Sequence, residues 1–439
     1  MSARLQEIDL SINGTLDAAR AQAEAWRREI VASAEDLTPT NISKKLRGLP
    51  LKAKTALRAS LSLPAGSLTV QTPEGRVLRI EGKAPGPDGV VVLKNWNLPK
   101  RALMHGTIGV GESYMDGDWD SPDVTSFLEL FCVNVDVGEA VSKSSRIMRG
   151  VDRVRNWLNR NTRDQAKKNI AAHYDLGNAF YDKWLDSSMT YSSGVYTTET
   201  NDLASAQKAK YQKIAKATDI TAEDHVLEIG CGWGGFAEYA ASEIGCRVTC
   251  LTISKEQFAF AKKRIAAAGL DDRVKIKFQD YRDEAGKYDK VVSIEMFEAV
   301  GEEFWETYFC KLSDVLKPGG KAGVQVITIC NNGYDVYRSQ PDFIQRYIFP
   351  GGMLPSPKIM EELAKSGSLD VIDTFCFPQD YARTLAEWRE RFWEAWDEIV
   401  PLGFDDRFKR MWEFYLYYCE AGFRSEFIDV RQITYQKPA

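Results

Sequence analysis

The sequence predicts an α/β protein, in which a domain with a parallel sheet covered by helices on both faces is preceded by a smaller α+β domain. After residue 205, five short apolar runs alternate with helical or looped segments, which is typical of a parallel sheet. Between 67 and 120, shorter alternating runs are separated by turn signals. A chain of 439 residues with 44% hydrophobic content is long enough for two or more cores.

The smaller domain is expected over residues 1–140. Its beginning looks helical and polar, and the segment 44–58 holds six basic residues and no acidic residue. Further on, Pro-Glu-Gly at 73–75 and Pro-Asp-Gly at 87–89 each lie between apolar alternating runs. Both tripeptides therefore predict the turns of antiparallel hairpins.

A basic amphipathic linker is expected over residues 141–168. The stretch 143–168 carries nine Lys or Arg residues against two Asp, which is a net charge of +7. Its apolar residues recur at helical spacing, and they are Ile147, Val151, Val154 and Leu158. An apolar face among basic residues suits the surface of an anionic bilayer. A solvated helix between the domains is the alternative.

The domain with the parallel sheet is expected over residues 169–439. Its strand candidates are "HVLEIGC" (225–231), "RVTCLTIS" (247–254), "VKIKFQD" (274–280), "YDKVVSIEM" (288–296), "KAGVQVITI" (321–329), "LDVIDTFCF" (369–377) and "FIDVRQITYQK" (427–437). An aromatic-rich helical block, 381–422, lies between the last two. Most of its aromatic residues recur at helical spacing and are therefore expected in the core.

Composition narrows the functional classes. A net charge of −5 argues against wholesale nucleic-acid binding. The eight cysteines form no Cys-x-x-Cys pair, and with three histidines a multi-histidine metal site is not expected. Scattered cysteines are typical of reduced thiols in a cytoplasmic protein. No apolar run approaches the roughly 18 residues of a transmembrane helix, and the N-terminus has no signal-peptide pattern, so a cytoplasmic protein is expected.

The first expected strand of the parallel sheet runs into a glycine-rich turn, "VLEIGCGWGG" (226–235). Glu228 is followed by Gly230, Gly232 and Gly234 at the edge of the sheet where such folds bind ligands. A dinucleotide site and a turn that serves only packing are alternatives. An acid before three alternate glycines resembles motif I of S-adenosylmethionine (SAM)-dependent methyltransferases, and "LKPGG" (316–320) is a second landmark of that group. The resemblance implies a Rossmann-like class I SAM methyltransferase domain.

Further motifs, ordered along 165–439, narrow the resemblance to the cyclopropane fatty acid synthase family. They are "AAHYDLGNAFYDKWLDSSMTYSSGVY" (171–196), "LTISKEQ" (251–257), "FQDYRD" (278–283), "MFEAVG" (296–301) and "YIFPGGMLPS" (347–356). The stretch "GVGESYMDGDWDSPDV" (109–124) is similar to that family's smaller domain, for which a lipid-binding or accessory role is expected. The resemblance implies a SAM-dependent enzyme that acts on unsaturated acyl chains of membrane phospholipids.

The resemblance also implies which residues contact SAM. They are Tyr191, Ser192, Glu228, Gly230, Gly232, Thr252, Ser254, Gln257, Asp280 and Tyr281. In this family the glycine motif holds the methionine part of SAM, and Asp280 would lie near the adenine. For Thr252 and Ser254 the alternative is capping of the helix "KEQFAFAKKR" (255–264), since a hydroxyl there satisfies free N–H groups.

The family's chemistry needs a base. Methylation of the cis double bond generates a carbocation, and loss of a proton from the new methyl group closes a cyclopropane ring. Loss from a neighbouring carbon leaves a methyl-branched alkene, so the position of the base decides the product. In the synthases the base is a bicarbonate, whose ligands correspond here to Ser193, Glu298, Gln325, Ile327 and Tyr381. Ser193 and Gln325 stand where the family has Cys and His, and Gln carries no titrating proton, which argues against a bicarbonate relay.

Glu295, in "SIEMFEAVG" (293–301), stands where the family has a small residue. Desolvation raises the pKa of a carboxylate in a lipid-lined pocket and makes it a better base, and the neighbouring Glu298 acts in the same direction. We hypothesise that Glu295 replaces bicarbonate, or helps to replace it, as proton acceptor, with Glu298 orienting the site. The alternative is that Glu295 caps a helix or pairs with a nearby basic residue.

The sequence therefore predicts a SAM-dependent C-methyltransferase of unsaturated phospholipid acyl chains, with a methyl-branched unsaturated product such as would precede furan fatty acids. The alternatives are a true cyclopropane synthase, a SAM enzyme acting on a soluble small molecule, and a non-catalytic SAM- and lipid-binding relative. The expected partners are the phospholipid substrate, the anionic inner face of the membrane with peripheral attachment, and further copies of the chain in a homodimer or higher homo-oligomer.

Overall fold

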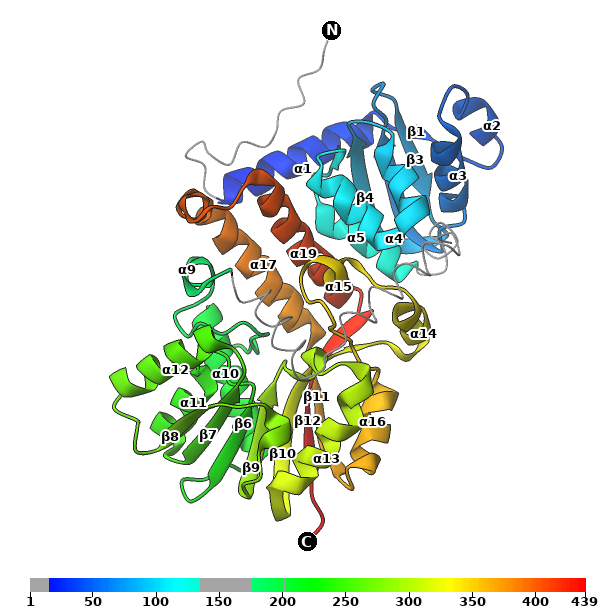
Figure 1. The fold of residues 1–439 in the computed structure, drawn as a ribbon. Coiled ribbons are helices and arrows are strands. Elements are labelled where there is room, and N and C mark those ends of the chain that lie inside the picture. Colours follow the sequence, from blue (N-terminus) through cyan, green and yellow to red (C-terminus); the bar gives the residue numbers. More distant parts are fainter. Residues whose placement is uncertain (1–15, 135–175, 201) are drawn as a thin grey trace. The chain divides into compact units, whose positions relative to one another are not determined.

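The computed structural model describes residues 16–134, 176–200 and 202–439 (Figure 1). The basic linker expected over 141–168 lies outside the described residues. In the part that is described, no helix combines the length and the apolar character needed to cross a bilayer.

The contacts of the chain divide it into two compact units. Unit 1 comprises Met1–Gly150 and Phe392–Ser425, and unit 2 comprises Val151–Arg391 and Glu426–Ala439. The sequence led us to expect residues 169–439 as one continuous domain. In the structure, the segment 392–425 packs instead with the N-terminal part of the chain.

Unit 1 contains a five-stranded sheet in the order β1-β3-β2-β4-β5. β2 and β3 pair in antiparallel register around the turn at 72–76, so the hairpin predicted at Pro-Glu-Gly is confirmed. The buried side chains of Leu78, Val90 and Val92 contribute to the core of this unit. The strands are β1 (Glu35–Asp36), β2 (Ala65–Gln71), β3 (Val77–Glu81), β4 (Ala84–Leu93) and β5 (Trp119–Asp120).

The second predicted hairpin turn, at Pro-Asp-Gly, is wrong. These residues lie inside β4, which runs parallel to β2. Asp88 is held there by the Ser67 hydroxyl at 2.5 Å and by the Arg79 guanidinium at 2.8 Å. At Gly89 an added Cβ would lie 3.2 Å from Cα of Phe127, so a helix packs closely on this part of the strand. Tertiary contacts therefore override the turn tendency of the tripeptide.

The C-terminal helix of unit 1, α19 (Asp406–Arg424), begins after Asp405, whose side chain accepts a hydrogen bond from the Phe408 amide. The buried Phe414 ring of α19 lies 5.7 Å from the Tyr114 ring of α4. Aromatic packing of this kind explains why the segment joins unit 1. The other helices are α1 (Leu16–Ala32), α2 (Ile42–Lys45), α3 (Leu51–Ser60), α4 (Asn97–Met115), α5 (Val124–Val133) and α18 (Trp396–Ile399).

Unit 2 contains a seven-stranded sheet in the order β11-β12-β10-β9-β6-β7-β8. The strands from β10 to β8 in this order run parallel, whereas β12 pairs in antiparallel register with β10 and β11. The predicted parallel sheet is therefore confirmed. The strands are β6 (His225–Ile229), β7 (Arg247–Thr252), β8 (Val274–Phe278), β9 (Tyr288–Ile294), β10 (Leu316–Ile329), β11 (Asp370–Cys376) and β12 (Ile428–Gln436).

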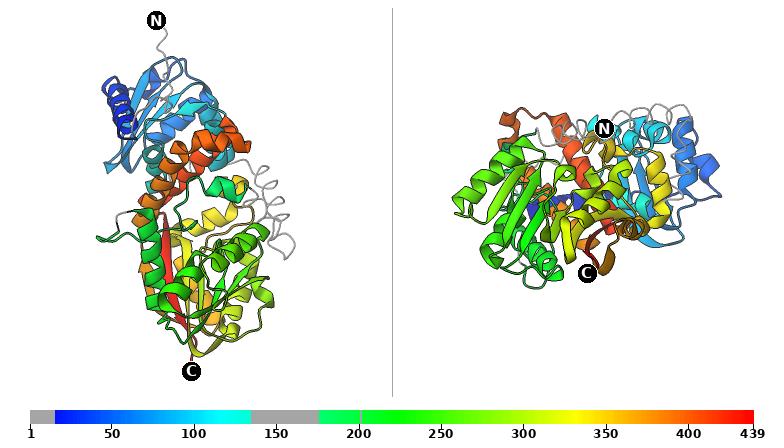
Figure 2. Two further views of the ribbon diagram at one scale, coloured as in Figure 1. Left: turned by 90° about the vertical axis from the view of Figure 1, so that its left-hand side faces the viewer. Right: turned by 60° about the horizontal axis from the view of Figure 1, so that its bottom comes forward.

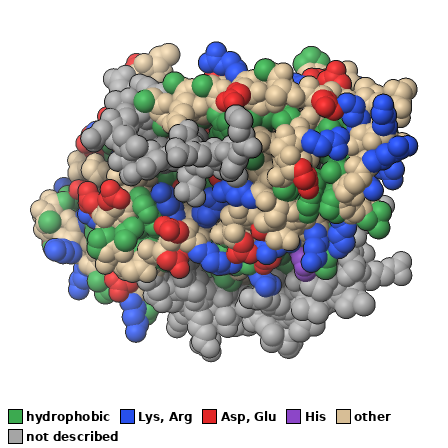
Figure 3. Space-filling view, turned by 90° about the horizontal axis from the view of Figure 1, so that it is seen from above, with side chains coloured by type: hydrophobic (Ala, Val, Ile, Leu, Met, Phe, Trp, Pro, Cys, Tyr) green, Lys and Arg blue, Asp and Glu red, His purple; other side chains and the backbone are tan. Residues whose placement is uncertain are grey.

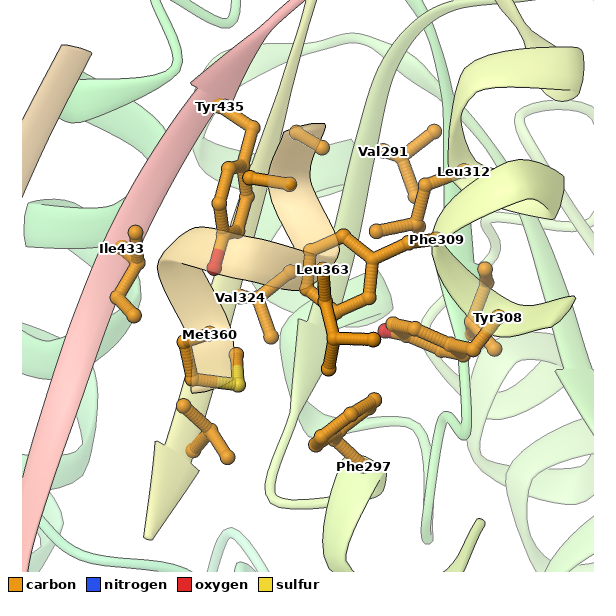
Figure 4. Packing of buried hydrophobic residues seen from close by; sticks show 14 of the residues in the cluster. Val291, Phe297, Tyr308, Phe309, Leu312, Val324, Met360, Leu363, Ile433 and Tyr435 are labelled. Carbon is orange, nitrogen blue, oxygen red and sulfur yellow. The ribbon is translucent and has the colours of Figure 1, made fainter. Parts of the chain in front are cut away.

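Helices cover both faces of this sheet (Figures 1 and 2). Leu227 and Val291 belong to a buried cluster with α13 and α16, whereas Val226 and Val292 belong to a cluster with α10, α11 and α12. This alternation follows the two-residue period of a strand. Figure 4 shows side chains of α13 and α16 gathered around Val291 and Val324. The helices are α9 (Asn178–Tyr181), α10 (Leu203–Ala217), α11 (Gly235–Tyr239), α12 (Lys255–Ala267), α13 (Trp305–Val315), α14 (Asn331–Ser339), α15 (Phe343–Tyr347), α16 (Pro357–Ser366) and α17 (Pro378–Glu394).

The order of the strands determines where unit 2 can bind a ligand. β6, the first of its strands in the chain, lies between β7 and β9. The chain proceeds from β6 to β7 and β8 and later returns to β9 on the other side. In such sheets ligands bind at the carboxyl ends of the strands where the order changes direction. The glycine turn after β6 and Glu295 after β9 both lie at that point.

Candidate active site

The glycine turn after β6 requires residues without a side chain. Gly230 and Gly232 have φ values of +81° and +51°, a backbone region that favours glycine. A Cβ added to Gly230 would lie 2.5 Å from Cγ of Met296, whereas one added to Gly232 would meet nothing within 4 Å. Gly230 thus packs the end of β6 against the end of β9. Gly232 leaves its backbone open to a ligand, which fits the cofactor that the motif implies.

Thr252, Ser254 and Gln257 form one hydrogen-bonded group after β7. The Thr252 hydroxyl donates to Gln257 Oε1 at 3.1 Å, and the Ser254 amide donates to the Thr252 oxygen at 3.1 Å. The Ser254 side chain accepts a hydrogen bond from the Gln257 amide and caps α12. The capping alternative therefore holds for Ser254. Contacts of these three residues with SAM stay predictions.

Asp280 and Tyr281 follow β8 at the same edge of the sheet. The Asp280 carboxylate accepts hydrogen bonds from the Arg282 guanidinium at 2.9 and 2.6 Å. The Tyr281 ring lies 5.5 Å from the Tyr308 ring of α13. Burial raises the pKa of Tyr281, and the charge of Arg282 opposes this rise. The residues predicted to contact SAM after β6, β7 and β8 thus lie along one edge.

Glu228 lies within β6 and is 3% exposed. Sγ of Cys250 donates to its carboxylate at 3.3 Å. Burial raises the pKa of Glu228 to about 8, although the hydrogen bond from Cys250 and the charge of Lys210 oppose the rise. The surroundings of Glu228 therefore favour its protonated form more than water does.

Tyr191 and Ser192 lie in the loop that precedes α10. The Tyr191 ring lies 5.2 Å from the Trp388 ring of α17. Two side chains of α10 hold Ser192: Lys210 Nζ donates to its hydroxyl at 2.5 Å, and Gln207 Nε2 donates to its carbonyl at 2.8 Å. Hydrogen bonds from α10 therefore help to hold this loop in place.

Glu295 follows β9 with a φ of +48°, which is uncommon for a residue with a side chain. Its amide donates to the Gln325 carbonyl at 2.8 Å. Its carboxylate accepts hydrogen bonds on Oε1 from the Ser193 amide at 2.9 Å and from Gln325 Nε2 at 2.7 Å. Oε2 accepts one from the Tyr381 hydroxyl at 2.6 Å. Three segments that are far apart in the sequence thus converge on one carboxylate.

The donors to Glu295 are residues that the family resemblance assigns to bicarbonate. Ser193, Gln325 and Tyr381 all direct their N–H or O–H groups at the Glu295 carboxylate. A carboxylate is a planar oxyanion like bicarbonate, and these donors are already engaged with it. The residues present therefore do not fit a bicarbonate ion at this position. None of these three hydrogen bonds comes from a backbone N–H at the start of a helix, so they do not support the alternative that Glu295 caps a helix.

The other two residues that the resemblance assigns to bicarbonate, Glu298 and Ile327, contact each other. The Ile327 amide donates to Glu298 Oε1 at 2.5 Å. Burial raises the pKa of Glu298 to about 8, and the charge of Glu295 adds to the rise. Burial also raises the pKa of Glu295, whereas the Tyr381 hydrogen bond and the charge of Lys210 lower it. Two neighbouring desolvated carboxyl groups resist ionising together, and Glu295, with three donors, is better able to carry the charge.

Lys210, Gln207 and Gln432 belong to no motif and were not predicted. Lys210 is 0% exposed, and its charge lowers the pKa of both Glu228 and Glu295. Burial lowers its own pKa to about 7. The sequence did contain a signal for Lys210, because it lies on the buried face of the amphipathic helix α10. A charged residue in such a position needs a partner.

Comparison with known proteins assigns the chain to a family. Residues 161–433 match the family described as mycolic acid cyclopropane synthetase. The chain is 42% identical over 347 residues to tuberculostearic acid methyltransferase UfaA1 of Mycobacterium tuberculosis, with 77% of this chain and 80% of the relative covered. It is 35% identical over 364 residues to the cyclopropane-fatty-acyl-phospholipid synthase of Escherichia coli K12, with 82% and 90% covered.

A solved structure supports the same assignment. The mycolic acid cyclopropane synthase CmaA1, complexed with SAH and CTAB, is 28% identical and aligns with a TM-score of 0.58, covering 62% of this chain and 98% of that chain. SAM is accordingly the methyl donor, and the open glycine turn with the polar edge of β6–β8 fits it. The chain belongs to the cyclopropane fatty acid synthase family and is a SAM-dependent methyltransferase with a Rossmann-like fold that acts on lipid acyl chains.

Proposed function

We propose that the enzyme methylates the cis double bond of unsaturated acyl chains in membrane phospholipids and forms a methyl-branched unsaturated chain, a precursor of furan fatty acids. The proposal is carried by the Glu295 carboxylate, which accepts hydrogen bonds from Ser193, Gln325 and Tyr381. In the cyclopropane synthases the corresponding groups hold bicarbonate. A carboxylate of the protein at this position is a built-in proton acceptor.

SAM supplies an electrophilic methyl group when it is bound at the carboxyl edge of β6–β8. The π electrons of the acyl double bond form the new C–C bond while the S–C bond breaks, which leaves a cation on the adjacent chain carbon. Glu295 then takes a proton from a carbon next to the cation. The electron pair of that C–H bond becomes a new double bond, so the acyl chain gains a methyl branch and stays unsaturated.

The neighbours of Glu295 support this role. The donors Ser193, Gln325 and Tyr381 stabilise its ionised form before the reaction. Glu298, with a pKa of about 8, stays mostly neutral near pH 7 and adds little further negative charge.

A cyclopropane product is the competing outcome within the same family. The E. coli relative is named for cyclopropane formation, whereas the M. tuberculosis relative is named as a methyltransferase. We favour the branch because the base is fixed to the end of β9 by the protein backbone. A tethered carboxylate and a separate ion present their oxygen atoms differently, and the position of the base selects the proton that is lost.

The product can be identified by mass spectrometry of fatty acids from cells that express the protein. Branch formation and ring formation both add one CH₂, so fragmentation must locate the branch and the double bond. We expect a methyl branch next to the new double bond. A ring with no double bond at that position would overturn the branched assignment.

The base can be tested with Glu295→Gly. Glycine accepts the φ of +48°, and the donors of Ser193, Gln325 and Tyr381 become available. We expect turnover to fall by about 10²–10⁴-fold. Added bicarbonate should restore part of it, whereas chloride at equal ionic strength should not. Full turnover without bicarbonate would contradict the assignment of Glu295 as the base.

Two further variants sharpen this test. Combining Glu295→Gly with Gln325→His rebuilds the histidine of the family's bicarbonate site, so both bicarbonate rescue and ring formation should increase. Glu302→Gln is the matched control, because it removes a carboxylate that contacts Arg338 outside this hydrogen-bonded group. It should keep the wild-type rate and product.

A phospholipid substrate requires contact with a bilayer, and a basic surface of unit 1 suits an anionic one. The stretch 37–73 contains six basic residues and no acidic residue. On α3, Lys52 and Arg58 are exposed beside Leu51, which is 77% exposed, while Leu57 is buried. Basic side chains gather toward the right-hand edge of Figure 3, the side on which Figure 1 draws α2 and α3. An exposed apolar side chain among cations is typical of peripheral attachment to a membrane, here its inner face.

Vesicle binding tests this surface. A Leu51→Ser, Lys52→Glu, Arg58→Glu triple variant should bind anionic vesicles at least tenfold more weakly, since each basic residue near such a surface contributes about 1 kcal/mol. Binding to zwitterionic vesicles and turnover of detergent-dispersed lipid should change little. Lys83→Glu, an exposed basic position outside the stretch, is the control. Unchanged binding of the triple variant would contradict a role of this surface in membrane contact. The predicted basic linker would then be tested by reversing the charges of Arg146, Arg149, Arg153 and Arg155.

A further inference from the structure

The hydrogen bonds of Glu295 continue inward through two glutamine side chains. Gln325 Nε2 donates to Glu295 Oε1 at 2.7 Å. Gln432 Nε2 in turn donates to Gln325 Oε1 at 3.0 Å and to the Lys210 carbonyl at 3.2 Å. Gln325 and Gln432 are 0% and 3% exposed and lie directly opposite each other on β10 and β12. Side chains at opposite positions of an antiparallel pair are close enough to bond.

The backbone sets the direction of these bonds. The Lys210 carbonyl can only accept, so Gln432 must turn its NH₂ group toward it. The same NH₂ group also donates to Gln325, whose carbonyl oxygen accepts the hydrogen bond. The NH₂ group of Gln325 is left to point at Glu295. A backbone carbonyl thus determines, through two side chains, that a donor and not an acceptor faces the carboxylate.

Lys210 also anchors the second donor to Oε1 of Glu295. Its Nζ atom donates to the Ser192 hydroxyl at 2.5 Å, and the next residue, Ser193, donates its amide to Oε1 at 2.9 Å. Both donors to Oε1 are therefore linked to Lys210 of α10. The Ser193 amide is linked through the Lys210 side chain, and the Gln325 amide is linked through Gln432 to the Lys210 carbonyl. Together with the covalent bonds within Lys210 and between Ser192 and Ser193, these hydrogen bonds close a ring on one side of the proposed base.

We propose that Gln432 is a positioning residue for the proton acceptor: it holds the Gln325 amide in one orientation and thereby keeps Glu295 ionised and ready to accept a proton. The inference rests on the proposed role of Glu295 as the base. Without Gln432, the Gln325 amide can turn over and offer its carbonyl oxygen. A carbonyl oxygen accepts a hydrogen bond from a protonated carboxyl group and so favours that form.

In this arrangement the side-chain oxygen of Gln432 accepts no hydrogen bond from the residues that the structure describes. This Oε1 atom is buried. A buried polar atom without a partner is unfavourable. The two acceptors on the other side, the Lys210 carbonyl and Gln325 Oε1, therefore decide how the Gln432 amide is turned.

The pH profile of methyl transfer tests the inference. It is measured as S-adenosylhomocysteine released from SAM, with vesicles of an unsaturated phosphatidylglycerol as the acceptor. In Gln432→Leu we expect the acid limb of the profile to move to higher pH by about half to one unit. Turnover should therefore fall at mildly acidic pH and recover toward the wild-type rate at alkaline pH. Gln432→Glu, which offers acceptors when ionised, should move the limb further in the same direction.

Two controls separate positioning from general damage to β12. Thr434→Val changes another buried polar residue of β12, two positions further along the same face. It should leave the acid limb in place even if it lowers the melting temperature. In a Gln325→Leu background, adding Gln432→Leu should cause no further shift of the limb, because the residue through which Gln432 acts is gone.

An acid limb that does not move in Gln432→Leu would overturn the inference, and so would a shift that persists in full in the Gln325→Leu background. If Gln432→Leu does not fold, Gln432→Met, with an unbranched side chain of similar length, provides the same measurement. Full turnover in Glu295→Gln would overturn the base assignment instead. That result is obtained without changing Gln432, so the two failures can be told apart.

Discussion

Asp88 in unit 1 and Glu295 in unit 2 are both partly buried carboxylates that accept several hydrogen bonds, but their partners differ. Asp88 pairs with the guanidinium groups of Arg27 and Arg79 and accepts a bond from Ser67. Burial would raise the pKa of Asp88, but the bonds from Ser67 and Arg79 and the nearby charges outweigh it and hold the pKa below its usual value. For Glu295 burial prevails, and the pKa is raised.

The comparison shows what distinguishes a structural carboxylate from a proposed base. Guanidinium groups neutralise Asp88 and lower its affinity for a proton, so it serves to join β2, β3 and β4. Amide and hydroxyl donors orient Glu295 without neutralising it, and burial raises its pKa, so its affinity for a proton is higher than that of an ordinary carboxylate. Five variants test this distinction.

The largest effect is expected for Glu295→Gln. The amide keeps the size of the side chain but cannot accept a proton, so turnover should fall by about 10²–10⁴-fold. The melting temperature of unit 2 should stay the same or rise, because a desolvated carboxyl group is removed. Turnover assays and calorimetry on the same preparation measure both. A fall in melting temperature with intact turnover would mean that Glu295 is structural, like Asp88.

Tyr381→Phe should have the next largest effect. The Tyr381 hydrogen bond lowers the pKa of Glu295, so its removal raises that pKa and favours the protonated form of the base. A hydrogen bond to a charged group contributes about 1.5–3 kcal/mol, so turnover at neutral pH should fall about tenfold or more. The loss should shrink as the pH of the assay rises. A loss of equal size at every pH would argue against an effect on ionisation.

Asp88→Asn should lower stability and spare catalysis. Removing the charge that Arg27 and Arg79 share should cost unit 1 about 1–3 kcal/mol at neutral pH. Because the folded-state pKa of Asp88 is lowered, its stabilisation is complete above the unfolded-state pKa and is lost as the pH falls through the folded-state pKa. Calorimetry should therefore show wild type and variant converging in acid. A turnover loss comparable with that of Glu295→Gln would contradict a purely structural role of Asp88.

Glu298→Gln should change the pH dependence of stability in the opposite sense. The folded-state pKa of Glu298 is about 8, against an ordinary value of 4.5, so between these values the unfolded chain releases a proton that the folded chain keeps. Stability therefore falls as the pH rises through this window, by at most about 1.4 kcal/mol per pH unit. The variant should lack this slope, which melting curves at a series of pH values will measure. Parallel curves for variant and wild type would mean that Glu298 does not titrate in this range.

The smallest effect is expected for Ser67→Ala. It removes one hydroxyl donor to Asp88, as Tyr381→Phe does for Glu295. With two guanidinium partners remaining, the cost should be about 1 kcal/mol of unit 1 stability. The pH profile of turnover should be unchanged. A shifted profile would show that donors matter to catalysis in both units alike.

Local sequence patterns predicted much of the fold. The strands of unit 2 and the glycine turn at Gly230 and Gly232 follow from short-range alternation and from the need for positive φ. The turn expected at Pro-Asp-Gly was wrong, because Asp88 is paired with Arg79 from a neighbouring strand. Residues 392–425 were expected in the domain over 169–439, but they pack in unit 1. Local patterns could not reveal this, because Phe414 packs on Tyr114, which lies far earlier in the chain.

Local patterns along the chain were enough to predict the class of enzyme and to identify the unusual carboxylate. Motifs in the chain marked Glu228, the glycines and Glu295, because each is read from its immediate neighbours. The donation of hydrogen bonds from Ser193, Gln325 and Tyr381 to Glu295 was found only in the folded protein. Hydrogen-bond direction depends on which groups meet in space, and the groups that orient Gln325, on β12 and α10, are distant in the chain. A residue pattern can name a base, but the surrounding donors set its charge.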